Sequence, residues 1–187
     1  MKQLILVLFI LISLTPKVTG QDKLEWSETL KLTVDDFKGL PPEPPAHQSL
    51  ILSFRLESNL KKEDIESLKT SKTFNSRVTN SFSRYHSWID RTEASRLRYA
   101  ITLFDLNEWM TRELRRRFDE NRDMVLAGYY QIIQEDVRKE FDKIRQDYNN
   151  ESNSGNNPAG QTNWELRISE GILALGIYCK TCEPKKE

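Results

Sequence analysis

The sequence predicts an α+β fold, in which a small antiparallel sheet is followed by three helices. Two long segments, at residues 92–121 and 123–148, repeat apolar residues at helical spacing, and a shorter one follows at 162–176. Within residues 22–89, several segments instead show alternation of apolar and polar residues, which is typical of half-buried strands. Strands that precede a run of helices favour a sheet packed on helices over a parallel α/β sheet.

The stretch from Leu97 to Phe118 predicts the central helix of the fold. Residues three and four apart share one face of a helix. The apolar stripe of this helix is formed by Tyr99, Leu103, Leu106, Met110 and Leu114. Apolar residues beside the stripe widen it to more than half of the helix circumference. These residues are Leu97, Ala100, Ile101, Phe104 and Phe118. The narrow polar face that is left holds Arg98, Asp105, Arg112, Glu113 and Arg116. We therefore expect this helix to be buried on most of its surface.

A second stripe predicts the helix at 123–148. Its members are Leu126, Tyr130, Ile133, Val137, Phe141, Ile144 and Tyr148. Such a stripe fits either a partner helix in the same chain or a coiled-coil seam with another chain. Because the central helix has a wide apolar arc that needs a cover, we expect the two helices to pack antiparallel. A tight connection around Asn121–Asp123 would join them.

The first half of the chain is expected to supply the strands. Gln21–Leu32 shows partial alternation, and Phe74–Ile89 fits one or two strands. Ala46–Leu56 carries Leu50, Leu52, Phe54 and Leu56 on one face, as a half-buried strand does. The charged segment Lys61–Thr73 is expected to be a turn or an excursion between strands. These segments together predict a small antiparallel sheet.

The segment Thr33–Pro42 predicts a rigid corner. Thr33 can cap a short helical turn, Gly39 can supply a positive φ, and the prolines can continue neither a helix nor a central strand. A proline-rich ligand for another domain is the weaker interpretation, because the cluster Pro41–Pro45 is short.

Side-chain chemistry also predicts where helices begin. Asp90 or Thr92 is expected to cap the central helix. Asn149–Gly160 is rich in glycine, asparagine and serine, which predicts a loop. Thr162 followed by Glu165 has the spacing of a capping box, so we expect the last helix to begin there.

Residues 1–20 predict a secretory signal peptide. Lys2 gives a basic start, Leu4–Leu14 is an apolar run of suitable length, and small residues precede a cleavage ahead of Gln21. An uncleaved membrane anchor is the alternative, but the run is short for a membrane span. We expect one secreted or periplasmic domain at 21–187, with no integral membrane segment after cleavage.

The charge balance argues against nucleic acid as a partner. The chain has 28 basic and 28 acidic residues and a formal net charge of zero, so it lacks the basic excess that binds polyanions or anionic membranes. Arg115–Arg117 is a local exception. Consecutive residues on a helix point in different directions, so we interpret this run as a solvated helix end.

The central helix also carries a resemblance to a known family. The residues Leu97–Leu106, Leu-Arg-Tyr-Ala-Ile-Thr-Leu-Phe-Asp-Leu, are similar to the His-Glu-x-x-His-Phe-Asp-[Ile/Leu] helix of a bacterial family of predicted secreted zinc-dependent proteases. Three further patches resemble family segments in the same order, at 32–42, at 87–89 and from Tyr148 onward, and Val34 replaces a family tryptophan in the first. The resemblance covers most of the chain after residue 20 and implies a zincin-like metallopeptidase scaffold.

The same resemblance identifies the positions of the family's zinc site. Tyr99 stands at the first histidine, Ala100 at the glutamate, Leu103 at the second histidine and Ser154 at a downstream third histidine. In such a site the imidazoles bind zinc and the glutamate activates its water. A neutral phenol, a methyl group, an isobutyl group and a hydroxyl are poor replacements. We therefore expect neither zinc nor a catalytic residue here, and a dry cleft partly filled by core.

Other catalytic or metal centres have little support in the sequence. The two histidines, His47 and His86, lie in the expected strand region without a ligand spacing between them, and we interpret each as a surface or hydrogen-bonded residue. No serine-nucleophile elbow and no phosphate-binding glycine loop occurs. A metal-dependent protease with unrecognised ligands stays open as an alternative.

Cys179 and Cys182 are the only cysteines. In an exported protein such a pair usually forms one disulfide. The Cys-x-x-Cys spacing also occurs in thiol oxidoreductases, but there it opens a helix after a strand, whereas here it follows the last helix. We expect a short C-terminal tail with an internal or intermolecular disulfide, and a thiol-disulfide protein is the alternative.

These expectations combine into one functional hypothesis. The chain would be an exported, catalytically inactive homologue of secreted zinc-dependent proteases. It would act as a binding or structural protein, with an unidentified protein or cell-envelope partner and no cofactor.

Overall fold

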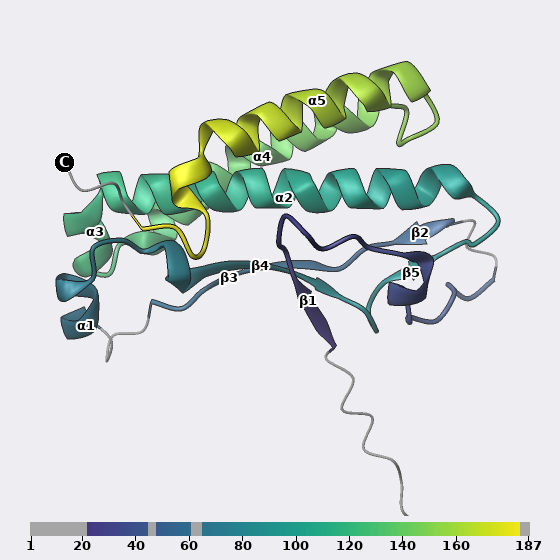
Figure 1. Ribbon diagram of the computed structural model, residues 1–187. Coiled ribbons are helices and arrows are strands. Elements are labelled where there is room, and N and C mark those ends of the chain that lie inside the picture. Colours follow the sequence, from purple (N-terminus) through teal and green to yellow (C-terminus); the bar gives the residue numbers. More distant parts are fainter. Residues whose placement is uncertain (1–21, 45–47, 61–64, 184–187) are drawn as a thin grey trace, which may run out of the picture.

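The computed structural model describes residues 22–44, 48–60 and 65–183. The expected signal peptide and His47 lie outside these residues. The described part has a mixed α+β fold with a small antiparallel sheet and five α-helices (Figure 1). The coarse fold class expected from the sequence is therefore confirmed.

The sheet has two separate parts. The three-stranded part has the antiparallel order β1 (Lys23–Glu25), β4 (Val78–Ser83), β3 (Phe54–Ser58). The two-stranded part pairs β2 (Leu50–Ile51) with β5 (Trp88–Ile89). Phe82 of the central strand lies opposite Leu24 on one side and opposite Phe54 on the other. The expected single strand over Ala46–Leu56 is thus wrong, because its described residues are divided between the two parts.

The helices follow the sheet with one exception. The five α-helices are α1 (Ile65–Thr70), α2 (Ala94–Glu120), α3 (Arg122–Leu126), α4 (Tyr130–Glu151) and α5 (Pro158–Ala174). Short 3-10 turns occur at Val34–Asp36, Asn75–Arg77 and Gly176–Tyr178. Figure 1 shows α2 running between the strands on one side and helices α4 and α5 on the other. The exception is α1, which lies within the segment expected to be a turn.

Helix α2 is buried on two faces, as its wide apolar arc predicts. The stripe from Tyr99 to Leu114 packs in the larger hydrophobic cluster with α4 and α5. Ala100 and Phe104 belong to a second cluster, where they meet Phe82 and Ile89 of the strands. Phe104 stacks on Phe54, with the ring centroids 5.4 Å apart. Burial of these rings and aliphatic side chains is the main stabilising contribution to the fold.

Helix α4 packs antiparallel to α2, which confirms the expected intrachain pairing. Near the end of α2, Arg117 binds Glu140 in the middle of α4, and near the beginning of α2, Tyr99 stacks on Tyr148 near the end of α4. The connection differs from the expected tight turn. It contains the short helix α3 and reverses after it at Gly128, whose φ is +91°.

The expected corner after β1 forms, but Gly39 acts differently. Thr33 precedes the 3-10 turn as its N-cap, and its hydroxyl donates to Asp36 at 3.0 Å. Among the described glycines, Gly128 and Gly155 have a positive φ, whereas Gly39 does not. A Cβ atom there would lie 2.7 Å from the carbonyl oxygen of Ser87. Glycine is needed because two backbone segments approach closely.

Four expected helix boundaries are wrong. Helix α4 begins at Tyr130 rather than at residue 123. Helix α2 begins after Glu93 rather than after a capping Asp90 or Thr92, and Asp90 instead accepts hydrogen bonds from the backbone and hydroxyl of Thr92. Helix α4 extends to Glu151, and α5 already begins at Pro158. Proline suits the first turn of a helix because no partner exists there for the missing N–H.

The Thr162 capping box is therefore not the start of α5. Thr162 lies one turn inside the helix, and its hydroxyl donates to the carbonyl oxygen of Pro158 at 3.0 Å.

Across the described residues, no helix combines the length and apolar character that a membrane crossing requires.

Candidate functional site

Three of the four positions picked out by the resemblance meet at one surface hollow. Tyr99 and Leu103 come from α2, and Ser154 comes from the turn after α4; together with residues of the β2 region they line a shallow hollow of about 550 Å³. We call it the α2 hollow. Ala100 does not line it, since its methyl group is fully buried in the cluster beneath the strands.

The side chains at these positions do not fit a zinc site. The Tyr99 hydroxyl donates to Asn149 at 2.6 Å, and burial raises the pKa of the phenol, so it is neutral at physiological pH. Ala100 and Leu103 have no donor atom, and Ser154 offers only a hydroxyl. Among the described residues, no group of three or more histidine, cysteine, aspartate or glutamate side chains is arranged to hold a metal ion.

The turn at this hollow is fixed by close packing. Asn153 and Ser154 have positive φ values of 47° and 50°. Gly155 has a φ of +88°, and a Cβ atom there would lie 2.7 Å from Cβ of Tyr99. The Ser154 carbonyl accepts a hydrogen bond from Arg96 at 2.9 Å. Ser154 is thus held next to α2 by backbone geometry.

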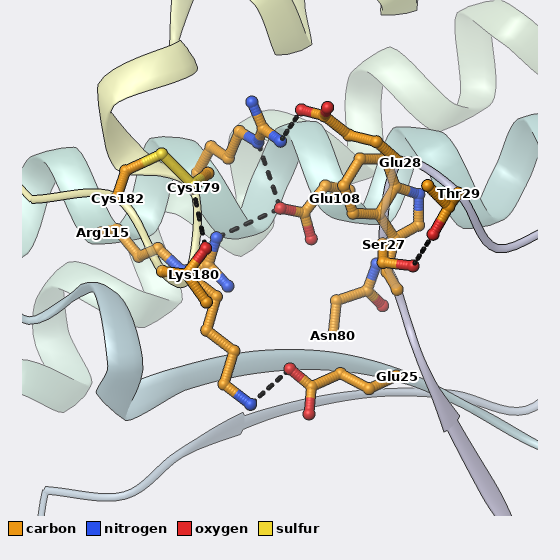
Figure 2. Close-up of a pocket in the computed structure, with 13 residues that line it drawn as sticks. Glu25, Ser27, Glu28, Thr29, Asn80, Glu108, Arg115, Cys179, Lys180 and Cys182 are labelled. Atoms are coloured by element: carbon orange, nitrogen blue, oxygen red, sulfur yellow. Dashed lines mark hydrogen bonds and ion pairs between the residues drawn. A yellow bond between two sulfur atoms is a disulfide. The ribbon is translucent and has the colours of Figure 1, made fainter.

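A second site lies on the opposite half of α2, and the sequence did not indicate it. A cavity of about 600 Å³ lies between α2, the central strand, the segment after β1 and the C-terminal tail. Figure 2 shows residues that line it. We call it the arginine cavity. It is lined by Asn80, Glu108, Arg112, Arg115, the segment 25–29 and the segment 179–182.

Three charged side chains of the arginine cavity are almost fully buried. Glu108, Arg112 and Arg115 are 3%, 2% and 1% exposed. Both arginines donate to the same oxygen, Oε1 of Glu108, at 3.1 Å each. Burial raises the pKa of Glu108 and lowers that of Arg115, although each group attracts the other. The cluster holds two positive charges and one negative charge.

This burial corrects two interpretations of the sequence. Arg112 and Glu113 were expected on the narrow polar face of the helix, yet both are buried. Arg115 was expected at a solvated helix end, but its guanidinium donates to the carbonyl oxygens of Val78 and Tyr178. Helical spacing does not reveal this burial, since neither Arg112 nor Arg115 lies three or four residues from a member of the α2 stripe.

Trp26 separates the arginine cavity from a smaller one. Its indole N–H donates to Asp105 at 2.7 Å, and its ring lies 5.3 Å from the guanidinium carbon of Arg112. The smaller cavity, of about 290 Å³, lies between the segment after β1 and helices α2 and α5. Burial raises the pKa of Asp105 at this boundary.

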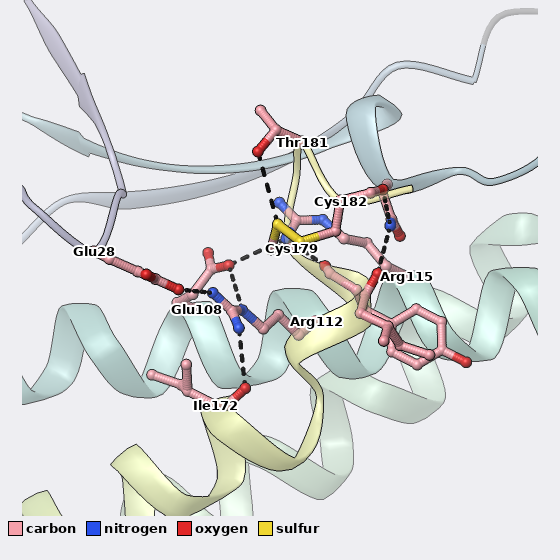
Figure 3. Close-up of a disulfide and its surroundings, with 11 residues drawn as sticks. Glu28, Glu108, Arg112, Arg115, Ile172, Cys179, Thr181 and Cys182 are labelled. Carbon is pink, nitrogen blue, oxygen red and sulfur yellow. Dashed lines mark hydrogen bonds and ion pairs between the residues drawn. A yellow bond between two sulfur atoms is a disulfide. The ribbon is translucent and has the colours of Figure 1, made fainter. Parts of the chain in front are cut away.

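The C-terminal tail forms one wall of the arginine cavity. Cys179 and Cys182 are joined by a disulfide with an S–S distance of 1.97 Å, and both line the cavity (Figure 3). Asn75 donates to the carbonyl oxygens of Ile177 and Cys182 at 3.0 Å each. Lys180 forms an ion pair with Glu25. The tail is therefore attached to the body of the fold on both sides of the disulfide.

His86, the histidine that lies within the described residues, has a hydrogen-bonding partner. Nδ1 of His86 lies 2.9 Å from the hydroxyl of Ser83. This contact agrees with the expectation of a hydrogen-bonded histidine.

Comparison of the chain with protein-family models, with curated proteins and with solved structures found no match.

Proposed function

We propose that this protein is an exported, catalytically silent relative of secreted zinc-dependent proteases, and that it acts as a binding protein. The observation that carries the proposal is the meeting of Tyr99, Leu103 and Ser154 at the α2 hollow. A helix brings residues four apart to one face, but Ser154 comes from a distant turn. A zinc site of the family type needs this combination of two helix positions and one downstream position.

The chemistry of the three side chains supports binding rather than catalysis. An aromatic ring, an isobutyl group and a hydroxyl can contact a partner, but they supply neither a metal-activated water nor a general base. The exported location rests on the apolar segment at residues 4–14 and the small residues that follow it.

A restoration experiment tests the protease-like frame. The triple variant Tyr99→His, Leu103→His, Ser154→His places three imidazoles at the three positions. It should bind close to one zinc ion per chain, measured by inductively coupled plasma spectrometry after gel filtration. The double variant Tyr99→His, Leu103→His is the matched control and should retain much less zinc. Equal zinc in the two variants would show that Ser154 is not at a ligand position, and the frame would be rejected.

The unmodified protein tests the absence of catalysis. It should hold no stoichiometric zinc after expression in zinc-supplemented medium, and it should not cleave casein. Cleavage of casein that a chelator abolishes would establish instead the alternative of a protease with unrecognised ligands.

A thiol-disulfide protein is the second candidate, and the position of the disulfide favours it. Both sulfur-bearing residues line a cavity next to the buried cation Arg115, and a nearby positive charge stabilises a thiolate. The test is reduction of insulin disulfides by the protein in the presence of dithiothreitol, with Cys179→Ala as the comparison. A wild-type rate equal to that of the variant would reject this candidate.

A further inference from the structure

The smaller cavity beside Trp26 combines apolar walls with a carboxylate. We call it the Asp105 cavity. Its volume is about 290 Å³, and it lies between the segment after β1 and helices α2 and α5. Its apolar walls are formed by Leu30, Ile168, Ile172 and Leu173. Apolar walls with a few fixed polar groups are the usual form of a small-ligand site.

The charged lining of the Asp105 cavity is mainly acidic. It has three carboxylates, those of Glu28, Asp105 and Glu165, and one ammonium group, that of Lys31. Glu165 is neutralised by Arg98, which donates to it at 2.7 and 2.6 Å. Lys31 is exposed. The lining therefore favours a cation over an anion.

Asp105 is the lining carboxylate that has no ion pair within the described part of the chain. Oδ1 of Asp105 accepts the indole N–H of Trp26 at 2.7 Å, which fixes the orientation of the carboxylate. Oδ2 accepts no hydrogen bond from a described residue, and it is not among the fully buried polar atoms that lack a partner. Oδ2 is therefore accessible to a donor from outside the protein.

A cation at Oδ2 would stabilise this carboxylate. Asp105 is half-buried. Burial raises the pKa of its carboxyl above the ordinary value, despite the hydrogen bond from Trp26 and the attraction of Lys31. The neighbouring groups thus compensate the charge incompletely. A charge-assisted hydrogen bond from an ammonium group would supply the missing partner.

We propose that the Asp105 cavity binds a primary ammonium group carried on a short apolar chain. The ammonium group donates to Oδ2 of Asp105, and the chain lies against Ile168 and Ile172 of α5. The residues of this cavity differ from those of the α2 hollow, so the proposal does not depend on the protease-like frame.

Three matched probes test the proposal at pH 7, where a primary amine is protonated. Pentylamine has the charge and the chain, pentanol lacks the charge, and methylamine lacks the chain. Binding is measured by titration of the Trp26 indole N–H signal in NMR spectra of the purified protein, assigned with Trp26→Phe. Pentylamine should bind about tenfold more tightly than either other probe, because each lacks one of the two interactions. Equal affinity for the three probes, or no saturable shift with pentylamine, would overturn the proposal.

A fourth probe distinguishes the two sources of such a group. Nα-acetyl-lysine N-methylamide carries an ammonium group on a chain of similar length, joined to a peptide unit. If it binds more tightly than pentylamine, the ligand is a lysine side chain of a partner protein. If it binds more weakly, the ligand is a small free amine. Either result requires that both compounds bind in the Asp105 cavity.

A matched pair of variants tests the role of Asp105. Asp105→Asn keeps an acceptor for Trp26 and removes the charge, so it should abolish the preference for pentylamine over pentanol. Glu170→Gln removes an exposed charge of α5 that does not line the cavity and should leave the preference unchanged. Circular dichroism checks the folding of both variants. A preference that persists in folded Asp105→Asn would overturn the proposal, and if this variant does not fold, the comparison of probes on the wild type decides.

Discussion

Arg98 of α2 and Glu165 of α5 form an ion pair through two hydrogen bonds. Nε of Arg98 lies 2.7 Å from Oε1 of Glu165, and Nη2 lies 2.6 Å from Oε2. Gln161 also donates to this carboxylate, and it donates to Thr102 and accepts from the hydroxyl of Tyr148. Polar contacts thus link α2, α4 and α5 in addition to their hydrophobic contacts.

The Arg98–Glu165 pair predicts a loss of stability in acid. Burial alone would raise the pKa of Glu165, but the hydrogen bonds from Arg98 and Gln161 outweigh it, so the pKa is lower than its ordinary value of 4.5. A lowered pKa in the folded state stabilises the fold above pH 4.5, and this contribution disappears as the pH falls through the folded-state pKa. Glu165→Gln should cost at most about 1 kcal/mol at pH 7, because the pair is partly exposed to solvent.

Urea denaturation of both proteins at pH 7 and pH 3 measures this effect. The difference in the free energy of unfolding should shrink at the lower pH. A difference that is the same at both pH values would contradict the prediction.

Asp105 predicts a pH dependence of the opposite sign. Burial raises its pKa above the ordinary value of 3.8, despite the hydrogen bond from Trp26. A raised folded-state pKa means that the fold loses stability as the pH rises from 3.8 through the folded-state value. Asp105→Asn keeps an acceptor for the indole and removes the charge, so it should raise the melting temperature at pH 7 and have little effect at pH 3. A lower melting temperature for the variant at pH 7 would refute this interpretation.

Removal of the central carboxylate of the arginine cavity should be strongly destabilising. Glu108→Gln leaves Arg115 with carbonyl oxygens and Arg112 with the exposed Glu28 as partners, and breaking a buried ion pair costs about 3 to 5 kcal/mol. Glu120→Gln is a suitable comparison, because Glu120 also pairs with an arginine but is exposed; its cost should be below about 1 kcal/mol. Chemical denaturation at pH 7 measures both changes. Similar values for the two variants would mean that the buried cluster is more hydrated than its exposure suggests.

Alanine substitutions at Gly128 and Gly155 distinguish the cost of backbone strain from the cost of steric contact with Tyr99 at the α2 hollow. Gly128 and Gly155 have similar positive φ values, +91° and +88°, but only Gly155 has Tyr99 within contact distance of an added Cβ atom. Gly128→Ala should cost about 1 to 2 kcal/mol from backbone strain. Gly155→Ala should cost a further 1 kcal/mol or more, by the usual magnitude of overpacking. Equal free energies of unfolding for the two variants would show that the turn moves away from α2 without cost.

The parts of the fold that were predicted correctly are those that a local pattern determines. The stripe of α2 from Tyr99 to Leu114 and the stripe of α4 from Ile133 to Tyr148 each repeat over several turns, so neighbouring elements cannot easily override them. The antiparallel pairing followed from the need to cover the arc of α2. The order of a small sheet followed by long helices was also predicted by the spacing of apolar residues, which changes from every second residue to every third or fourth residue.

The errors lie where distant contacts decide the local structure. Apolar residues stand at every second position from Leu50 to Leu56, yet the strand is interrupted because Leu50–Ile51 pairs with β5 and the segment from Phe54 pairs with β4. Gly39 is explained by the approach of Ser87, which no pattern near Gly39 reveals. The segment 149–160 is polar and glycine-containing, but α4 extends into it as far as Glu151 and α5 begins in it at Pro158.

The arginine cavity was missed for the same reason. Its groups come from four separate parts of the chain: the segment after β1, β4, α2 and the tail. In the sequence, Arg112 and Arg115 have the appearance of ordinary surface residues of a helix. Only the position of the tail over that end of α2 shows that they are buried.

The C-terminal tail forms one wall of the arginine cavity, and the contacts of Asn75 determine when that wall can form during synthesis. Its two hydrogen bonds reach carbonyl groups 102 and 107 residues further along the chain. Such contacts require closure of a very long loop and cannot exist until the ribosome has released residue 182 from its exit tunnel. A nascent chain that stops short of the tail would therefore expose Arg112 and Arg115 to water, however completely its sheet and helices had already assembled.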